Sequence, residues 1–198
     1  MMGQASFDLI VIGAGQAGPF LAAKLAHAGK KVALIEARQL GGTCVNRGCT
    51  PTKTLRKSAR VAYMARRAAE FGVDVGPVTV NFGVAMARMR KRITDARTGL
   101  EGWLGALPGL TIHYAHGQLA GRDGADFIVQ AGEHTLRAPQ VVLNTGTRSF
   151  MPPIPGLSTV PALDSEGLLA LDELPKKLVI IGVGYISLEM AQIFRRLG

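Results

Sequence analysis

Residues 7–18 read Phe-Asp-Leu-Ile-Val-Ile-Gly-Ala-Gly-Gln-Ala-Gly, and this stretch decides the fold. Its apolar run, residues 7–12, is typical of a strand that is buried on both faces of a parallel sheet. The glycine-rich turn leads into a predicted helix over residues 19–28. Residues 31–36, Lys-Val-Ala-Leu-Ile-Glu, are predicted as the next strand, so the sequence begins with a complete β-α-β unit.

The glycines of the turn have separate purposes. Gly13 permits a tight turn, Gly15 lets a diphosphate approach the backbone, and Gly18 lets the helix pack close to the strand. The helix N-terminus adds free N–H groups and a positive dipole end. Glu36 ends the second strand about 20 residues after Gly15, the spacing of an acid that binds a ribose hydroxyl. We therefore predict a dinucleotide site rather than a purely structural turn, formed by Gly13, Ala14, Gly15, Gln16, Ala17, Gly18 and Glu36.

Further elements follow the first unit. A helix is predicted with Thr50 as its N-cap and Pro51 at its first position, running to about Phe71. Asn81 can cap a second, amphipathic helix of about 20 residues. Short strands separated by glycine-rich turns predict a small antiparallel meander, and a buried strand follows it. These strands are expected at residues 111–115, 127–130 and 134–137, and the buried one at 140–145.

The composition changes at residues 151–175, where Pro152, Pro153, Pro155 and Pro161 mark an extended connection. We expect a first domain over residues 1–150 and the start of a second β-α unit over residues 176–198. That unit has an apolar run at 177–181, then Gly182-Val-Gly184-Tyr185-Ile186-Ser187 and a helix. Because no strand returns from this helix, we expect the chain to be the N-terminal part of a longer protein.

Two cysteines, Cys44 and Cys49, are separated by four residues in a glycine-rich loop that leads into a helix. The glycines let the chain bend enough for the sulfurs to meet, and a helix N-terminus favours a thiolate. The first ten residues show no secretory signal, so a reducing cytosol is expected, where such a pair is catalytic more often than structural. Two inert buried thiols are the alternative. No second cysteine or histidine pair offers the ligands of a zinc site.

The chain is basic, with 23 Lys and Arg against 14 Asp and Glu, a net charge of +9. The excess lies in residues 53–67 and 88–97, which we interpret as solvated helix faces, with an anionic cofactor or acidic partner as the alternative. No aromatic residues alternate with these cations to stack on bases, which argues against a nucleic-acid binder. No apolar run approaches the ~20 residues of a membrane span, so no membrane partner is expected.

Taken together, these motifs resemble the class I pyridine nucleotide–disulfide oxidoreductases, the flavin-dependent group of glutathione reductase, dihydrolipoamide dehydrogenase and mercuric reductase. The most specific stretch is Gly-Gly-Thr-Cys-Val-Asn-Arg-Gly-Cys-Thr-Pro-Thr-Lys at residues 41–53. The resemblance implies an α/β fold: a Rossmann-like FAD-binding domain over residues 1–150 with a parallel sheet and a small antiparallel meander. The first β-α unit of an NAD(P)-binding domain would follow at residues 176–198.

The resemblance also implies residue roles. Cys49 would face the flavin and form a charge-transfer pair with it, and Cys44 would be the interchange thiol that attacks the substrate. Lys53 would lie near the reactive nitrogen of the flavin and pair with Glu189. The FAD contacts would include Thr43, Gly117, Thr145 and Gly146, and the NAD(P)H contacts Gly182, Gly184, Tyr185 and Ile186.

The implied reaction passes electrons from NAD(P)H through FAD to a Cys44–Cys49 disulfide, and then to a small-molecule disulfide or a metal ion. A cytoplasmic homodimer is implied for the full-length protein. The family's acid–base His–Glu pair lies in a C-terminal domain beyond residue 198, so residues 1–198 are not expected to turn over alone. The alternative for these residues is a non-enzymatic FAD-binding fragment.

Overall fold

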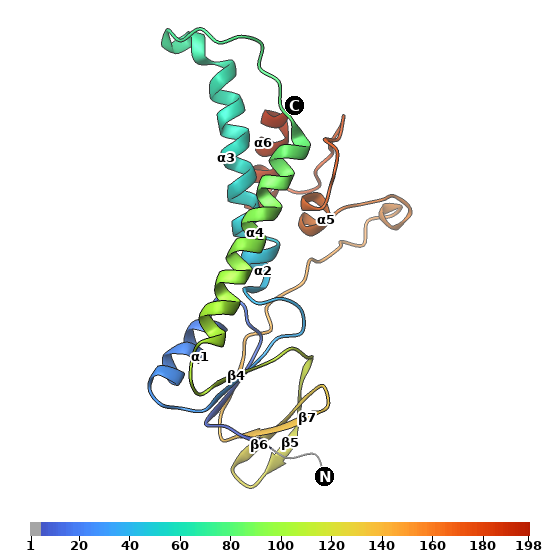
Figure 1. Cartoon of the computed structure of the whole chain (residues 1–198). Coiled ribbons are helices and arrows are strands. Elements are labelled where there is room, and N and C mark those ends of the chain that lie inside the picture. Colours follow the sequence, from blue (N-terminus) through green and yellow to red (C-terminus); the bar gives the residue numbers. More distant parts are fainter. Residues whose placement is uncertain (1–4) are drawn as a thin grey trace. The chain divides into compact units, whose positions relative to one another are not determined.

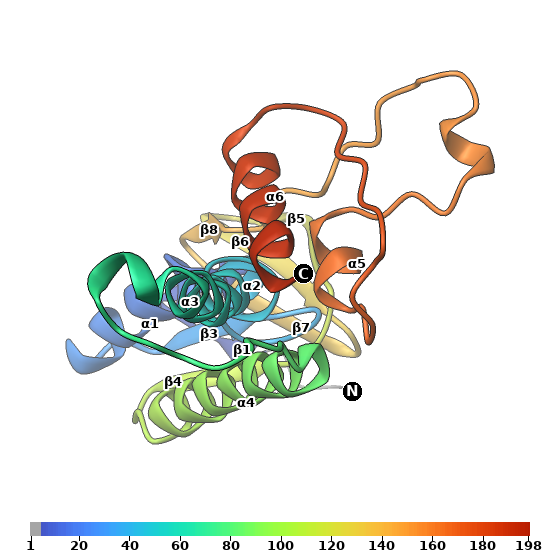
Figure 2. The ribbon, with the colours of Figure 1, turned by 90° about the horizontal axis from the view of Figure 1, so that it is seen from above.

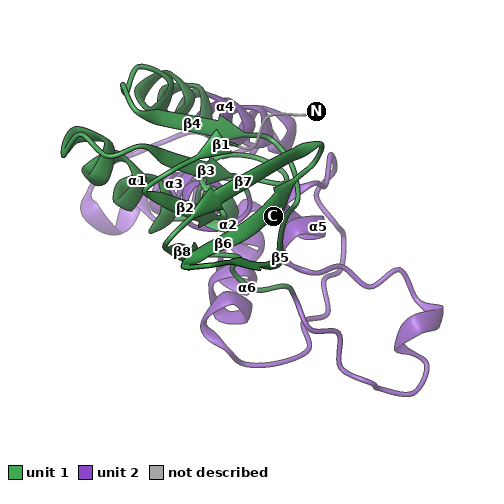
Figure 3. Ribbon diagram, turned by 90° about the horizontal axis from the view of Figure 1, so that it is seen from below, with its two compact units in different colours: residues 1–46, 95–148 green, residues 47–94, 149–198 purple. Residues whose placement is uncertain are grey.

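A computed structural model describes residues 5–198 and divides the chain into two compact units (Figures 1 and 3). Unit 1 comprises the chain up to Asn46 together with residues 95–148, coloured green in Figure 3. Unit 2 comprises residues 47–94 and 149–198, coloured purple. One long helix contributes its N-terminal part to unit 2 and its C-terminal part to unit 1.

Unit 1 contains a parallel sheet of four strands in the order β4-β3-β2-β8. Its two central strands are fully buried, which confirms the prediction from their continuous apolar runs. Ile10 of β2 pairs with Ala33 on one side and with Val141 on the other. The strands are β2 (Leu9–Ile12), β3 (Val32–Ile35), β4 (Leu110–His113) and β8 (Val141–Leu143).

A second sheet of unit 1 has the order β1-β7-β6-β5, in which β5, β6 and β7 form the predicted antiparallel meander. The meander's first strand was placed wrongly, however. Of the predicted residues 111–115, residues 111–113 belong to β4, which pairs in parallel with β3. The true first strand is β5, which has no β-branched residue and two glycines, so its sequence carries little strand signal. The strands are β1 (Ala5–Ser6), β5 (Gly117–Asp123), β6 (Asp126–Ala131) and β7 (His134–Ala138).

The two faces of the parallel sheet have different coverings, which gives unit 1 three layers. On one face, side chains of Leu9 and Val11 pack with α1 and with Leu104 of α4. On the other face, Ile10 and Ile12 pack against the meander. The α/β class, with a parallel sheet and a small meander, is therefore confirmed. The helices of this unit are α1 (Gly18–His27), α2 (Gly42–Asn46) and the C-terminal part of α4 (Phe82–Gly105).

His113, at the end of β4, gives unit 1 a defined sensitivity to acid. Its ring packs edge-on to Phe7 and lies 5.2 Å from the ring of His134, centroid to centroid. Its Nε2 atom is buried and has no hydrogen-bond partner among residues 5–198. Burial first, and then the neighbouring His134, hold the pKa of His113 below its ordinary value of 6.5.

We expect the free energy of unfolding to decrease as the pH falls below 6.5, because the unfolded chain then binds a proton that folded His113 resists. The variant His113→Gln should lose less of this free energy than the parent between pH 7.5 and 5, as measured by urea unfolding. His116→Gln is the control, since His116 is exposed and lies three residues beyond the end of β4. An equal acid sensitivity in both variants would contradict the assignment to His113.

Unit 2 is helical in the residues described. Helix α6 packs along α3 (Figure 2), and both contribute to one apolar cluster with the N-terminal part of α4 and with α5. The fully buried side chains of Leu55, Met86 and Ile193 lie in this cluster. The elements are α3 (Cys49–Arg66), η1 (Ala68–Phe71), the first part of α4, η2 (Leu157–Thr159), α5 (Ser165–Leu169) and α6 (Tyr185–Leu197).

The helix ends test two capping predictions. Asn81 caps α4 as predicted, because its Oδ1 accepts a hydrogen bond from the backbone N–H of Val84 at 3.0 Å. The prediction that Thr50 caps α3 was wrong, since the helix begins at Cys49 and Gly48 is its N-cap. Pro51 is thus the third helical residue. Proline is tolerated there because N–H groups of the first turn have no intrahelical partner.

Residues 177–181 do not form the predicted strand. They have no regular secondary structure, and the side chain of Val179 is 80% exposed. A strand exists through its hydrogen bonds to a neighbour, and within residues 5–198 no strand pairs with this run. The helix predicted after it is present as α6.

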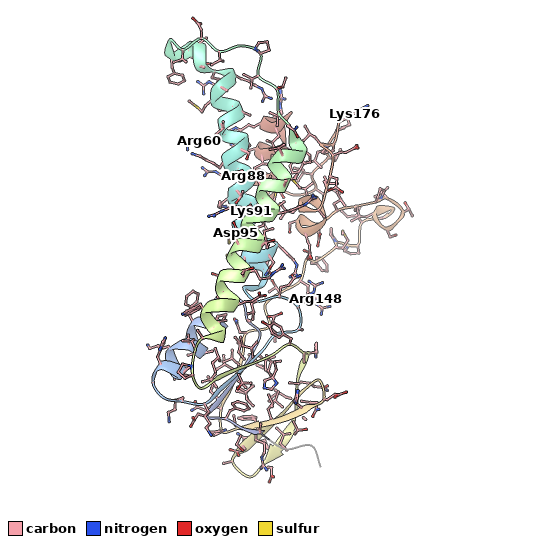
Figure 4. The ribbon with its side chains drawn as sticks, viewed as in Figure 1. Arg60, Arg88, Lys91, Asp95, Arg148 and Lys176 are labelled. Carbon is pink, nitrogen blue, oxygen red and sulfur yellow. The ribbon has the colours of Figure 1, made fainter. Side chains whose placement is uncertain are left out.

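The basic stretches lie on helices, as expected. Figure 4 labels Arg60 on α3 and both Arg88 and Lys91 on α4. Arg88 is bound within unit 2, where its guanidinium donates to the carbonyl of Thr54 and to the hydroxyl of Ser58. None of the helices in the described part of the chain is long and apolar enough to cross a membrane.

Candidate functional site: a dinucleotide cradle and two cysteines

The turn after β2 approaches neighbouring backbone so closely that Gly13 and Gly18 cannot carry a side chain. Gly13 has φ +105°, and a Cβ atom there would lie less than 3.0 Å from the carbonyl oxygen of Asn144. A Cβ on Gly18 would lie less than 3.0 Å from the carbonyl oxygen of Gly13. The roles predicted for both glycines, a tight turn and close helix packing, therefore match the geometry.

Asn144, which directly follows β8, holds this turn in place, and the sequence analysis missed it. Its side-chain Nδ2 donates to the carbonyl of Gly13 at 3.0 Å, and its backbone N–H donates to the carbonyl of Ile12 at 2.7 Å. The only signal in the sequence was its place between a buried strand and the predicted Thr145-Gly146 contact. The bond joins residues 131 positions apart, which periodicity cannot reveal.

Glu36 follows the neighbouring strand at the same edge of the sheet. Its Oε2 accepts from the backbone N–H of Ala14 at 2.8 Å, and its Oε1 accepts from the N–H of Arg38 at 2.8 Å. A carboxylate has about four acceptor positions, so two remain for hydroxyl donors. Its place directly after β3, linked to the glycine turn, suits the predicted ribose contact.

The loop with the first cysteine is held against the same turn. The N–H of Gly41 donates to the carbonyl of Ala14 at 2.8 Å. A Cβ on Gly42 would lie 2.7 Å from Cα of Gly15, so α2 starts in contact with the turn. Thr43 and Cys44 are the next residues of α2, and unit 1 thus brings them to the glycine turn.

Asn46 is a second residue that the sequence analysis missed. Its Nδ2 donates to the carbonyls of Leu40 and Gly42, both at 2.9 Å, and so closes the loop around α2. Its Oδ1 is buried and accepts no hydrogen bond from any residue in the range 5–198. Side-chain amides that bind a nearby backbone in this way commonly fix short loops.

The remaining predicted FAD contacts of unit 1 are Gly117, Thr145 and Gly146. A Cβ on Gly117 would lie 2.9 Å from Cγ2 of Ile12, so packing of β5 on the parallel sheet already requires glycine there. Thr145 and Gly146 follow Asn144 at the end of β8, and Gly146 has φ +69°. The ends of β2, β3 and β8 thus all carry predicted residues. Ligands of open parallel sheets bind at such carboxyl ends.

Cys49, Lys53 and Glu189 belong to unit 2. Cys49 is the first residue of α3 and is exposed, and both cysteines are thiols in the structure. The predicted pairing is present: Nζ of Lys53, one turn into α3, lies 2.6 Å from Oε1 of Glu189 on α6. The side chain of Lys53 remains 60% exposed, which leaves part of it open to other partners.

The second glycine turn precedes α6. Gly182 has φ +108°, Gly184 is the N-cap of α6, and Tyr185 is the first helical residue with 82% of its surface exposed. Ile186 is also exposed. The glycines therefore have the predicted turn and cap positions, but without a preceding strand. Their role toward NAD(P)H stays a prediction.

Comparisons with known proteins agree with this geometry. The family model described as "Pyridine nucleotide-disulphide oxidoreductase" matches residues 7–198. The chain belongs to this family. Its members are flavin-dependent oxidoreductases that use FAD and a pyridine nucleotide. The resemblance inferred from residues 41–53 and from the glycine turn is thus confirmed at the level of the family.

Individual relatives within the family have several activities in their names. The chain is 38% identical over 196 residues to a dihydrolipoyl dehydrogenase of Chlamydia trachomatis, covering 98% of the chain and 42% of the relative. It is 34% identical to a mercuric reductase of Shigella flexneri, covering 98% and 35%. The solved structure of RclA from Escherichia coli, a HOCl-induced flavoprotein disulfide reductase, superposes with a TM-score of 0.81 at 34% identity, covering 96% and 40%. The chain therefore spans about two fifths of the length of these relatives.

The residues of unit 1 fit FAD. The glycine turn leads directly into α1, which begins there with N–H groups suited to a diphosphate. Acceptor capacity remains on Glu36. The predicted diphosphate and ribose contacts thus both lie within unit 1.

Proposed function

We propose that the chain is the FAD-binding part of an NAD(P)H-dependent disulfide or metal-ion reductase, in which Cys44 and Cys49 form the redox-active pair. The observation that carries this proposal is the contact between α2, which bears Cys44, and the glycine turn at Gly15. It supports a diphosphate site and a thiol next to each other in one unit.

The residues of unit 1 would hold the cofactor. Backbone N–H groups at the start of α1 would bind the diphosphate, and Glu36 would accept from ribose hydroxyls. Thr43, Gly117, Thr145 and Gly146 would complete the contacts. FAD, when bound, supplies the capacity to accept a hydride and to pass on two electrons.

Cys44 and Cys49 would pass the electrons from FAD to the substrate. Cys49 would lie against the flavin, and Cys44 would attack the substrate by thiol exchange. Lys53 would present its positive charge near the flavin, oriented by Glu189 at 2.6 Å. Gly182, Gly184, Tyr185 and Ile186 would contribute to the NAD(P)H site, and we propose a cytoplasmic homodimer for the full-length protein.

The names of the relatives support a broad class of substrate for this chain. Dihydrolipoyl dehydrogenase, mercuric reductase and a flavoprotein disulfide reductase are all similar to this chain over nearly its whole length. A small-molecule disulfide or a metal ion is therefore the proposed electron acceptor.

We also propose the domain division expected from the sequence for this chain. Residues 1–150 would belong to the FAD-binding domain, residues 151–175 to the connection, and residues 176–198 to the start of the NAD(P)-binding domain.

The visible spectrum tests the proposal. The purified chain, supplied with FAD, should show a flavin spectrum that gains a long-wavelength shoulder after anaerobic addition of dithiothreitol, because the Cys49 thiolate then faces the flavin. A chain that binds FAD without any shoulder would support the non-enzymatic FAD-binding alternative. A chain that takes up no FAD would overturn the proposed cofactor site.

A further inference from the structure

Arg47 lies inside the cysteine loop and binds a distant helix. It is two residues before Cys49, and its Nε is 2.7 Å from Oε1 of Glu166 on α5. Only 17% of the Arg47 side chain is exposed, against 50% for Glu166. A guanidinium this shielded needs an ionic or hydrogen-bonding partner, so the contact is a structural feature of the loop.

Helix α5 is a fixed support although it belongs to the proline-rich connection. Asp164 caps it, with Oδ1 accepting from the N–H of Gly167 at 2.8 Å, and this bond lowers the pKa of Asp164. Leu168 and Leu169 are buried in the same apolar cluster as Leu55 of α3.

The other end of α5 is held by α4. Arg90 donates to the carbonyls of Ala170 and Leu171, both at 3.3 Å, and pairs with Asp172 at 2.7 Å. Since both of its ends and its apolar side are held, α5 presents Glu166 from a defined position.

The start of α3 has no side-chain cap. Gly48 is the N-cap and makes no side-chain capping bond, and Cys49 at the first helical position is exposed, whereas Pro51 and Thr52 in the same turn are buried. Two residues of backbone span at most about 7 Å, which is shorter than the Debye length of about 8 Å at physiological salt. Arg47 is close enough to Cys49 in the chain for its charge, and that of its partner, to be tested at the sulfur.

We propose that Arg47 and Glu166 are a positioning pair that holds the cysteine loop on α5 and balances the charge next to Cys49. The inference rests on the proposed function for its redox consequence. Reduction of a Cys44–Cys49 disulfide would break the S–S bond with two electrons, which the bound flavin would supply and in doing so be oxidised; Cys44 would take up a proton from solvent and Cys49 would remain as the thiolate. A positive charge near Cys49 favours the reduced pair, and a negative charge favours the disulfide.

The two single-charge variants should act in opposite directions. Glu166→Gln removes one negative charge beside Arg47, so the reduced chain should react with iodoacetamide at Cys49 about two to three times faster than the parent. Arg47→Gln removes one positive charge instead and should slow the reaction by a similar factor. Peptide mass spectrometry assigns the label to Cys49, and iodoacetamide is neutral, so the charges do not steer it.

Asp172→Asn is the matched control, because it removes one carboxylate from an arginine pair near the other end of α5. It should leave the rate unchanged. Arg47→Lys keeps the charge and should remain closer to the parent than Arg47→Gln. The proposal is overturned if Glu166→Gln and Arg47→Gln shift the rate in the same direction, or if Glu166→Gln behaves like Asp172→Asn. Alkylation by iodoacetamide needs no flavin. A chain that fails the spectral test of the proposed function can therefore still show the expected alkylation rates, so failure of one proposal can be told from failure of the other.

Discussion

Replacing Gly18 with alanine is expected to lower the free energy of unfolding by about 3 kcal/mol, the upper part of the range for overpacked sites. The added Cβ would lie less than 3.0 Å from the carbonyl oxygen of Gly13. It would also meet Nδ2 of Asn144 at 2.9 Å. A backbone carbonyl cannot move away cheaply, so α1 must shift from the parallel sheet.

The same substitution should weaken FAD binding. Shifting the start of α1 moves the N–H groups that would bind the diphosphate, and it disturbs the Asn144 bond that holds the turn. Urea unfolding followed by circular dichroism measures the first effect, and titration with FAD followed by flavin fluorescence measures the second.

Gly102→Ala is the matched control. Gly102 lies in α4 of the same unit, with ordinary helical backbone and no heavy atom within 4 Å of an added Cβ. Alanine there should raise the free energy of unfolding by up to about 1 kcal/mol, because glycine is a poor helix former. If Gly18→Ala unfolded at the same urea concentration as Gly102→Ala, the close approach between α1 and the turn would be refuted.

The sequence predicted those parts of the fold that local chemistry determines. Residues 9–12 are a continuous apolar run before a glycine turn, and such a run has few structures open to it besides a buried strand. Asn81 was predicted correctly as a cap because the bond it makes lies within its own helix turn.

Errors arose where the outcome depends on a distant partner. Residues 111–115 have a strand sequence that suits the meander or the parallel sheet equally, and the choice is made by β3. Residues 177–181 have an apolar strand sequence but find no strand to pair with in the described chain. Propensity alone therefore gave the element type but not its partner.

The candidate site divides in the same way. Gly13, Gly18 and Glu36 could be found from spacing, because the turn imposes a fixed register between strand, helix and acid. Asn144 and Asn46 could not, because each acts through a side-chain amide that binds backbone around it. The Lys53–Glu189 pair, 136 residues apart, was expected only through the family resemblance.

The two cysteines are expected to give opposite spectra when each is replaced by serine. Cys44→Ser leaves the Cys49 thiol unable to form a disulfide, so with FAD bound it should show the long-wavelength shoulder before any reductant is added. Cys49→Ser should show no shoulder with or without dithiothreitol. The comparison separates the thiol that faces the flavin from the thiol that meets the substrate.

Turnover of the full-length protein should fall on the order of a thousandfold or more in both variants, since each removes a member of a pair that acts as one unit. FAD binding should be nearly unchanged, because the diphosphate turn and Glu36 do not depend on either sulfur. Serine is close to cysteine in size, so loss of packing is a minor effect. If the shoulder appeared in Cys49→Ser instead of Cys44→Ser, the two roles would be exchanged, and α2, which contacts the glycine turn, would present the sulfur that faces the flavin.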